Sequence, residues 1–181
     1  MNAEVPPVMP PQLSAQGYRL RGERETDLPF LLKLYASTRA EELATVTGWT
    51  EPQKAVFVAQ QFNAQRLHFQ TRIAGCGFWI IECRGAQIGR LYLQDAPDHL
   101  HIVDVALMPD KRGAGVGSAI LAALLAQADA AAKPVSLNVE QTNIAQRLYH
   151  RLGFVITETN GIRYRMERAA RGFVPISLGV N

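Results

Sequence analysis

The residues best suited to chemistry lie between Asp104 and Ile120, in the run DVALMPDKRGAGVGSAI. Glycine occupies positions 113, 115 and 117, directly after Arg112 and before an Ala- and Leu-rich stretch that predicts a helix. Glycines allow a backbone to come close to an anion, and the first N–H groups of a helix point toward it. The run therefore predicts a phosphate-binding turn, to which Arg112 adds a full positive charge.

The spacing of the glycines distinguishes between the kinds of phosphate-binding turn. Glycine at every second position does not fit the dinucleotide fingerprint Gly-x-Gly-x-x-Gly, and the Gly-Lys-Ser/Thr that ends a P-loop is absent. What is present is Arg112-x-x-Gly115-x-Gly117, which resembles the acyl-CoA signature (Arg/Gln)-x-x-Gly-x-(Gly/Ala) of the GNAT acetyltransferase superfamily. On its own, this motif would also suit an ordinary glycine-rich turn.

A second stretch, residues 143–154 with the sequence NIAQRLYHRLGF, resembles the other GNAT hallmark, Asn-x-Ala-x-x-Leu-Tyr-x-x-x-Gly-Phe. It follows the next predicted strand, where that family places it. Two independent motifs in the right order and at the right separation make coincidence a poor explanation. The resemblance covers about residues 17–167 and implies an N-acetyltransferase that uses acetyl-CoA as co-substrate and no metal.

The resemblance also implies where the cofactor binds. The pyrophosphate would contact the N–H groups of the glycine turn, and the pantetheine arm would lie between a splayed fourth and fifth strand. GNAT proteins usually have a bulge in the fourth strand, which frees backbone groups for the ligand and places an oxyanion donor near Leu107. The implied cofactor-binding residues are Val105, Ala106, Leu107, Arg112, Gly113, Ala114, Gly115, Val116, Gly117, Ser118 and Asn143.

Two side chains are candidates for catalysis. Tyr149 matches the family's Tyr, whose hydroxyl lies near the CoA sulfur and can act as a general acid, although it could also be a packing residue. Asp104 lies mid-strand among apolar neighbours, where a carboxylate is costly unless its pKa is raised or it is bonded. We therefore take Asp104 as the first candidate for the general base, because Asn138 occupies the position where some members carry Glu. Alternatives are Glu140, His99, His101 and an ordered water.

The rest of the chain predicts the elements that hold these residues. Expected strands span 17–21, 78–83, 87–93, 99–108, 135–140, 154–158 and 162–167, the last two joined at Asn160-Gly161. Expected helices begin at Thr26 or Asp27, at Thr50, at Ser118 and at Thr142 or Asn143. The predicted fold class is α/β (α+β), a GNAT acyltransferase fold in which four helices flank a mixed six- to seven-stranded sheet.

Length and composition are consistent with one domain in a reducing compartment. The chain has 181 residues, 48% of them hydrophobic, and two cysteines, too few for a disulfide framework. We expect a flexible Pro-rich leader at 1–15, the acetyltransferase domain at 16–168, a tail at 169–181 and a cytoplasmic location. The net charge of +3 suits an anionic cofactor and does not indicate nucleic acid, and neither a membrane span nor a secretory signal is visible.

The amine acceptor is left open by the sequence: a polyamine, an aminoglycoside, an amino acid and a protein N-terminus all fit, and so does a homodimer. In GNAT folds the first two helices form one wall of the acceptor cleft. The candidate contacts on this wall are Glu41, Glu42, Trp49, Gln61 and His68. Two alternative functions also stay open: a non-catalytic acyl-CoA sensor or interaction module, and transfer of another acyl group or to a hydroxyl.

Overall fold

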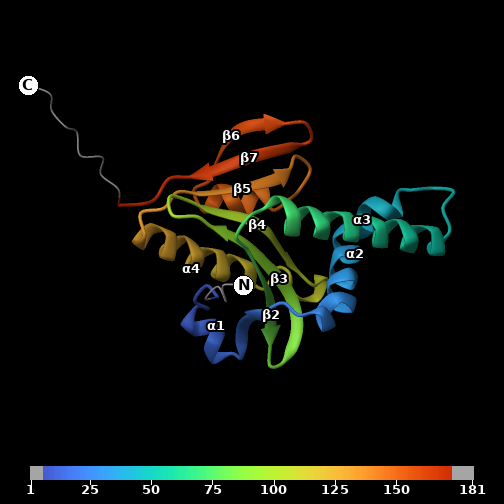
Figure 1. Ribbon diagram of the computed structural model, residues 1–181, viewed down its shortest axis with the longest axis horizontal. Helices are drawn as coiled ribbons and strands as arrows, with labels where there is room; N and C mark the ends of the chain where they lie inside the picture. Colours follow the sequence, from blue (N-terminus) through green and yellow to red (C-terminus); the bar gives the residue numbers. More distant parts are fainter. Residues whose placement is uncertain (1–5, 173–181) are drawn as a thin grey trace, which may run out of the picture.

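A computed structural model of the chain describes residues 6–172 and contains one mixed seven-stranded sheet (Figure 1). The strands, in the order β1-β2-β3-β4-β5-β7-β6, are β1 (Tyr18–Gly22), β2 (Cys76–Cys83), β3 (Ala86–Asp95), β4 (Leu100–Leu107), β5 (Val135–Glu140), β6 (Val155–Asn160) and β7 (Arg163–Arg168). The helices are α1 (Pro11–Ala15), α2 (Leu28–Ala44), α3 (Glu51–Arg72), α4 (Val116–Ala130) and α5 (Gln146–Arg151), with 3-10 turns η1 (Glu25–Asp27) and η2 (Pro109–Lys111). The predicted fold class is confirmed, with α2 to α5 as the four expected helices.

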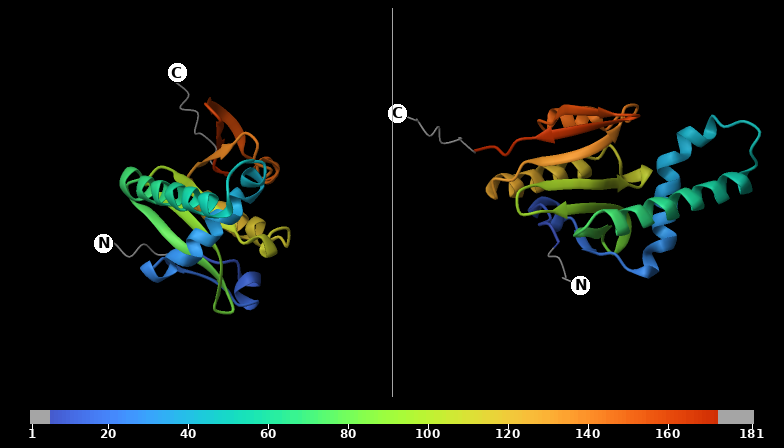
Figure 2. Two further views of the ribbon diagram at one scale, coloured as in Figure 1. Left: turned by 90° about the vertical axis from the view of Figure 1, so that its right-hand side faces the viewer. Right: turned by 45° about the horizontal axis from the view of Figure 1, so that its top comes forward.

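The sheet separates two hydrophobic cores because side chains alternate between its faces. The larger core lies under α4 and α5 and includes Trp79, Ile81 and Leu91 from the central strands. The smaller core lies under α2 and α3, where Ile80 packs against residues such as Tyr35. The outer end of α3 and its connection to α2 project beyond the sheet as an arm (Figure 2).

The expected bulge in β4 is present. Tyr92 of β3 pairs with Asp104, and its neighbour Leu93 pairs with Ile102, which leaves Val103 as the extra residue. Beyond the bulge, Val105 packs against the same core as Ile102, while Asp104 faces the other side of the sheet. The bulge thus decides which side chains of β4 face α4.

The parallel pairing of β4 with β5 is short. It runs from Leu100–Val135 to Ile102–Leu137 and then stops, although β4 continues to Leu107 and β5 to Glu140. The expected splaying of these two strands is therefore confirmed. Backbone groups of the later residues in β4 face a gap on one side and β3 on the other.

The two ends of the chain differ from expectation in one respect. Residues 11–15, expected to belong to a flexible leader, form α1, and Leu13 is buried in the larger core. Pro11 suits the first helical position because its fixed φ matches the helix. At the other end, Arg168 closes β7 and binds Asp129, whereas most of the predicted tail, residues 173–181, lies outside the described residues.

We predict that Gly89→Ala destabilises the fold by about 1–3 kcal/mol, because β3 and β4 approach closely at this position. A methyl group on Gly89 would overlap the carbonyl oxygen of Ala106 and lie 2.7 Å from Cδ2 of Leu107. Urea denaturation measures the effect. Gly22→Ala is the matched control, since no atom lies within 4 Å of its added methyl, and it should change the unfolding free energy by less than about 0.5 kcal/mol. Equal effects of the two substitutions would contradict the prediction.

Candidate active site

The N-terminus of α4 offers a set of unpaired backbone N–H groups. Gly113 and Gly115 have φ values of +75° and +80°, a left-handed conformation that favours glycine. Gly115 caps the helix without a side-chain bond, and its carbonyl accepts the first helical bond, from Ala119. Between residues 6 and 172, no described group accepts a bond from the N–H of Val116, Gly117 or Ser118. This turn can therefore bind an anion such as a pyrophosphate.

Arg112 lies beside this turn and contacts two other elements. Its Nε donates to the carbonyl of Leu107 at 2.8 Å, and its Nη2 donates to Oγ of Ser37 on α2 at 3.2 Å. The exposed guanidinium thus lies between the end of β4 and α2. It supplies positive charge at the point where the glycine turn and the gap between β4 and β5 meet.

Tyr149 lies on α5 at the edge of the larger core. The residue is 8% exposed, and its ring packs edge-on against Phe154 with 6.0 Å between centroids. No described residue forms a hydrogen bond with its hydroxyl. Because no described side-chain oxygen or nitrogen is both fully buried and unpaired, this hydroxyl must be partly accessible from outside the core. Burial, with a contribution from the negative charge of Asp104, raises the pKa of Tyr149 to about 12. At neutral pH the hydroxyl is a hydrogen-bond donor.

Asp104 has a different environment from the one its sequence neighbours suggest. Its Oδ2 accepts a bond of 2.6 Å from Nε of Arg90 on β3. Arg90 is buried and also donates from Nη2 to Oε1 of Gln65 on α3 at 3.0 Å. Burial opposes the charge on Arg90, but the surrounding acidic groups, Asp104 foremost, together outweigh burial and raise the pKa of Arg90. Asp104 is therefore bonded, the condition under which a carboxylate is tolerated among apolar neighbours, and its partner is a buried cation.

The other candidate bases are also paired. Glu140, at the end of β5, lies 3.4 Å from Arg39 and 3.8 Å from Arg163. His101 contacts Oγ of Ser136 at 2.8 Å in the paired part of β4 and β5, and burial lowers its pKa. His99 binds Asp98 at 2.8 Å.

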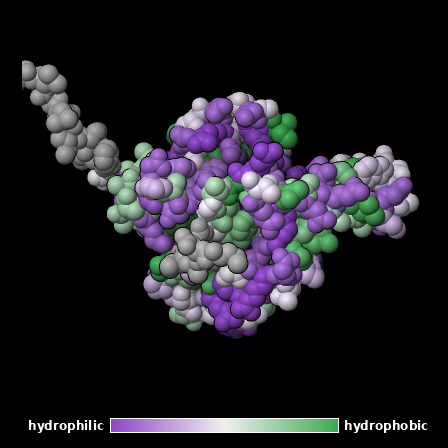
Figure 3. All heavy atoms as spheres, viewed as in Figure 1, coloured by the Kyte–Doolittle hydropathy of each residue, from purple (hydrophilic) through white to green (hydrophobic). Residues whose placement is uncertain are grey.

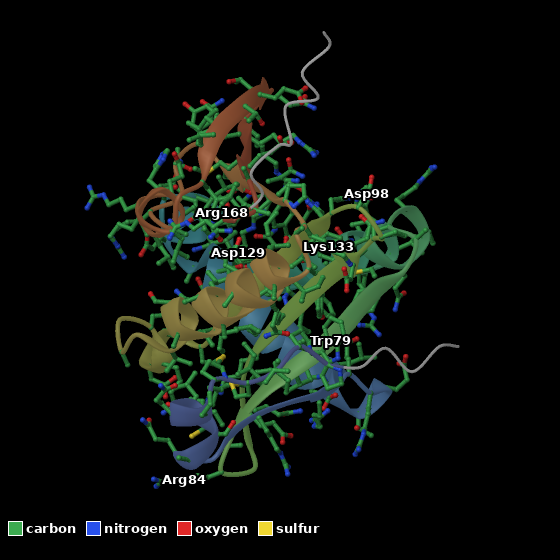
Figure 4. The ribbon with its side chains drawn as sticks, turned by 90° about the vertical axis from the view of Figure 1, so that its left-hand side faces the viewer. Trp79, Arg84, Asp98, Asp129, Lys133 and Arg168 are labelled. Atoms are coloured by element: carbon green, nitrogen blue, oxygen red, sulfur yellow. The ribbon has the colours of Figure 1, made fainter. Side chains whose placement is uncertain are left out.

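His99 and its partner Asp98 lie at the far end of α4 from the glycine turn. Asp98 lies near Lys133, just beyond the C-terminal end of α4 (Figure 4). The fifteen residues of α4 separate that end from the glycine turn by about 22 Å. His99, which binds Asp98, therefore lies far from the glycine turn. The carboxylate whose charge acts on Tyr149 is Asp104.

The residues expected on the acceptor wall are dispersed. Trp49 packs edge-on against Phe57, 5.2 Å between centroids, in an open hollow of about 530 Å³ on the projecting arm, where hydrophobic and hydrophilic surface is mixed (Figure 3). Glu42 binds Arg39, while Glu41, Gln61 and His68 are exposed. The residue of α3 that connects to Asp104 is instead Gln65.

Asn143, which the resemblance implies as a cofactor-binding residue, orders a loop in this structure. Its Oδ1 accepts a bond of 2.9 Å from the N–H of Ala145, which orders the loop before α5. This loop joins the end of β5 to the helix that carries Tyr149.

The described residues also include no group of three His, Cys, Asp or Glu suited to a metal ion, and no helix among them is long and apolar enough to cross a membrane.

This geometry agrees with the comparison to known proteins. Residues 74–156, which include the glycine turn and Tyr149, match the family model of the acetyltransferase (GNAT) domain. This match, together with the fold shared with solved GNAT structures, supports membership of the GNAT superfamily. No curated protein sequence matches it. Acyl transfer from a CoA thioester is the chemistry associated with this superfamily.

Solved GNAT structures share the fold at low sequence identity. The PaiA N-acetyltransferase of Thermoplasma acidophilum, solved with coenzyme A, has a TM-score of 0.62 and 16% identity over 84% of this chain and 98% of that chain. A GCN5-related N-acetyltransferase of Rhodopseudomonas palustris gives 0.58 and 20%, over 83% and 94%. YncA of Salmonella typhimurium, solved with acetyl-CoA, gives 0.53 and 18%, over 87% and 96%. At these identities the likeness is one of fold.

We predict that Arg112→Ala weakens CoA binding by roughly threefold to tenfold, the loss expected when one partly exposed charge is removed from an anion site that backbone N–H groups also line. Calorimetric titration with CoA measures the affinity. Arg72→Ala, which removes an exposed guanidinium from the last turn of α3, is the matched control and should leave the affinity unchanged. A loss of binding that is equal in both variants would contradict a specific role for Arg112.

Proposed function

We propose that this GNAT protein is an N-acetyltransferase that moves an acetyl group from acetyl-CoA to a primary amine within a ternary complex. The observation that supports this most directly is the coincidence of three features: the unpaired N–H groups at the start of α4, the gap between β4 and β5, and the free hydroxyl of Tyr149. A binding module would need the first two features only. Tyr149 packs in the same core as Val105 and Leu107 of β4, and this third feature favours catalysis.

The proposed reaction forms one bond and breaks one bond at the carbonyl carbon of the thioester. The neutral amine attacks the thioester carbonyl, a C–N bond forms, and the C–S bond breaks as CoA leaves. The amine's proton leaves through Asp104 or a water beside it, and the oxyanion is stabilised by a backbone N–H near Leu107. Negative charge develops on the leaving sulfur, for which Tyr149 is the available donor.

The pKa of Tyr149 limits what its hydroxyl can do. A thiol ordinarily has a pKa near 8.5, so a donor with a pKa of about 12 does not give up its proton to a thiolate in water. The burial that raises the pKa of Tyr149 would also raise that of a thiol placed beside it. We therefore propose that Tyr149 chiefly stabilises the leaving thiolate by a hydrogen bond. Any transfer of its proton to the sulfur would come only after the C–S bond has broken.

We predict that Tyr149→Phe lowers kcat by about a hundredfold, because one donor to developing charge is lost. CoA affinity should change by less than about threefold, because the phenylalanine ring keeps the packing against Phe154. Steady-state release of the CoA thiol measures kcat, and calorimetry measures the affinity. An unchanged kcat would remove Tyr149 from the mechanism.

The pH dependence gives a separate prediction. Because the pKa of Tyr149 is raised to about 12, its hydroxyl stays protonated up to about pH 11, and kcat should show no decline below pH 10 that depends on this residue. The pH–rate profile of Tyr149→Phe should be lower but of the same shape. A descending limb near pH 8–9 that is present in the natural protein and missing in Tyr149→Phe would contradict this assignment.

The overall proposal is tested by thiol release from acetyl-CoA in the presence of spermidine, kanamycin, L-lysine and a tripeptide with a free N-terminus. Acceleration by at least one amine, with a matching acetylated product in mass spectrometry, is the expected result. CoA binding without turnover of any of them would favour a non-catalytic acyl-CoA sensor.

A further inference from the structure

We propose that Arg90 is a positioning residue that orients Asp104 toward the acceptor amine, an inference that rests on the proposed acetyl transfer. Arg90 lies in the middle of β3, where a cation is costly to bury, and its side chain is only 3% exposed. It shares a face of the sheet with Asp104, since it pairs with Ala106, two residues beyond Asp104. Its position is set by the bulge that opens β4.

The guanidinium of Arg90 is fixed on three sides. Nε donates to Oδ2 of Asp104, Nη2 donates to Gln65, and the guanidinium carbon lies 5.2 Å from the centre of the Tyr92 ring. A planar guanidinium held in this way has little freedom to rotate. The carboxylate that it binds therefore has one defined orientation.

The carboxylate of Asp104 retains an oxygen for a ligand. Oδ2 is bonded to Arg90, whereas Oδ1 has no bonding partner among residues 6–172. The side chain is 24% exposed. Asp104 comes two residues after Ile102, where the pairing of β4 with β5 ends. Its charge also reaches Tyr149 from the opposite side of the sheet. An amine that enters the gap can therefore meet Oδ1 directly or through a water.

A second ion pair in the same protein shows what a purely structural pair looks like. Arg168 binds both oxygens of Asp129 at 2.8 Å, and the side chains are 5% and 21% exposed, close to the values for Arg90 and Asp104. This pair joins the end of β7 to the last turn of α4 (Figure 4). Both carboxylate oxygens are used there, and Asp129 also accepts a bond from the N–H of Arg171. The two pairs match in burial and differ in position.

The link to Gln65 extends the same role to α3. Gln65 is half-buried and provides the contact between this helix and Arg90. Its neighbour Arg66 binds Glu23 and so fixes the same turn of α3 to the segment between β1 and η1. The orientation of Asp104 therefore depends on how α3 is seated on the sheet.

The test is a double-mutant cycle with Arg90→Met and Asp104→Asn, assayed with the most active amine of the panel named above. If Arg90 acts through Asp104, Arg90→Met should lower kcat/KM for the amine on the order of tenfold to a hundredfold, and should have little further effect in Asp104→Asn. Arg90→Lys should recover part of the loss, and CoA affinity by calorimetry should be unchanged. Fully additive effects would overturn the proposal.

Arg168→Met is the matched control. It should lower the melting temperature, as Arg90→Met does, with kcat/KM unchanged below the transition. If Arg90→Met does not fold, Gln65→Ala and Arg90→Lys take its place. Each of these two variants should then lower kcat/KM in the natural background but not in the Asp104→Asn background. If neither variant lowers kcat/KM in the natural background, the proposal is overturned. A natural protein that binds CoA without turnover would overturn the proposed function itself, whereas turnover with additive variants would overturn only the role of Arg90.

Discussion

The structure depends on one short pairing, the parallel contact between β4 and β5 that ends at Ile102 and Leu137. Strands that stop pairing inside a sheet leave backbone N–H and C=O groups without partners, which is costly unless water or a ligand satisfies them. The extra residue Val103 marks the point of divergence on the other side of β4, where the pairing with β3 shifts. The bulge and the gap are thus two consequences of one local irregularity. Binding of an extended ligand in the gap would complete the missing bonds.

Topology brings the chemical groups to this gap. A helix must cross from β4 to the parallel β5, so α4 begins soon after β4 ends, with only η2 and the glycine turn between them. The helix after β5 then brings Tyr149 back over the same face. On the opposite face, β3 and α3 supply Arg90 and Gln65. The groups proposed to bind the anion, to donate a hydrogen bond and to orient the carboxylate therefore come from different elements of the fold.

Much of this arrangement could be predicted from the sequence. The glycine turn, the Tyr149 motif and the capping box at Thr50, which opens α3, are local patterns in which the residues that interact are close in the chain. The position of α1 was missed because prolines indicate a flexible segment as readily as a helix start, and only the burial of Leu13 distinguishes the two.

The surroundings of Asp104 could not be predicted in the same way. Its partner Arg90 lies fourteen residues away, and the contact between them depends on the register of β3 against β4 beyond the bulge. A shift of one residue would place Asp104 on the other face of the sheet. The signal that was present in the sequence is an arginine within the apolar run around Ile88 and Leu91, which indicates a buried cation that requires a partner.

The most direct test of the account is amide hydrogen exchange with and without CoA. If the ligand lies in the gap and its pyrophosphate contacts the start of α4, exchange should slow in peptides that contain residues 105–107 and 113–118. The outer strand β6, residues Val155–Asn160, should be unaffected. Binding of CoA that protects neither of the first two segments, or that protects β6 instead, would contradict the central claim that the opening between β4 and β5 is the ligand site.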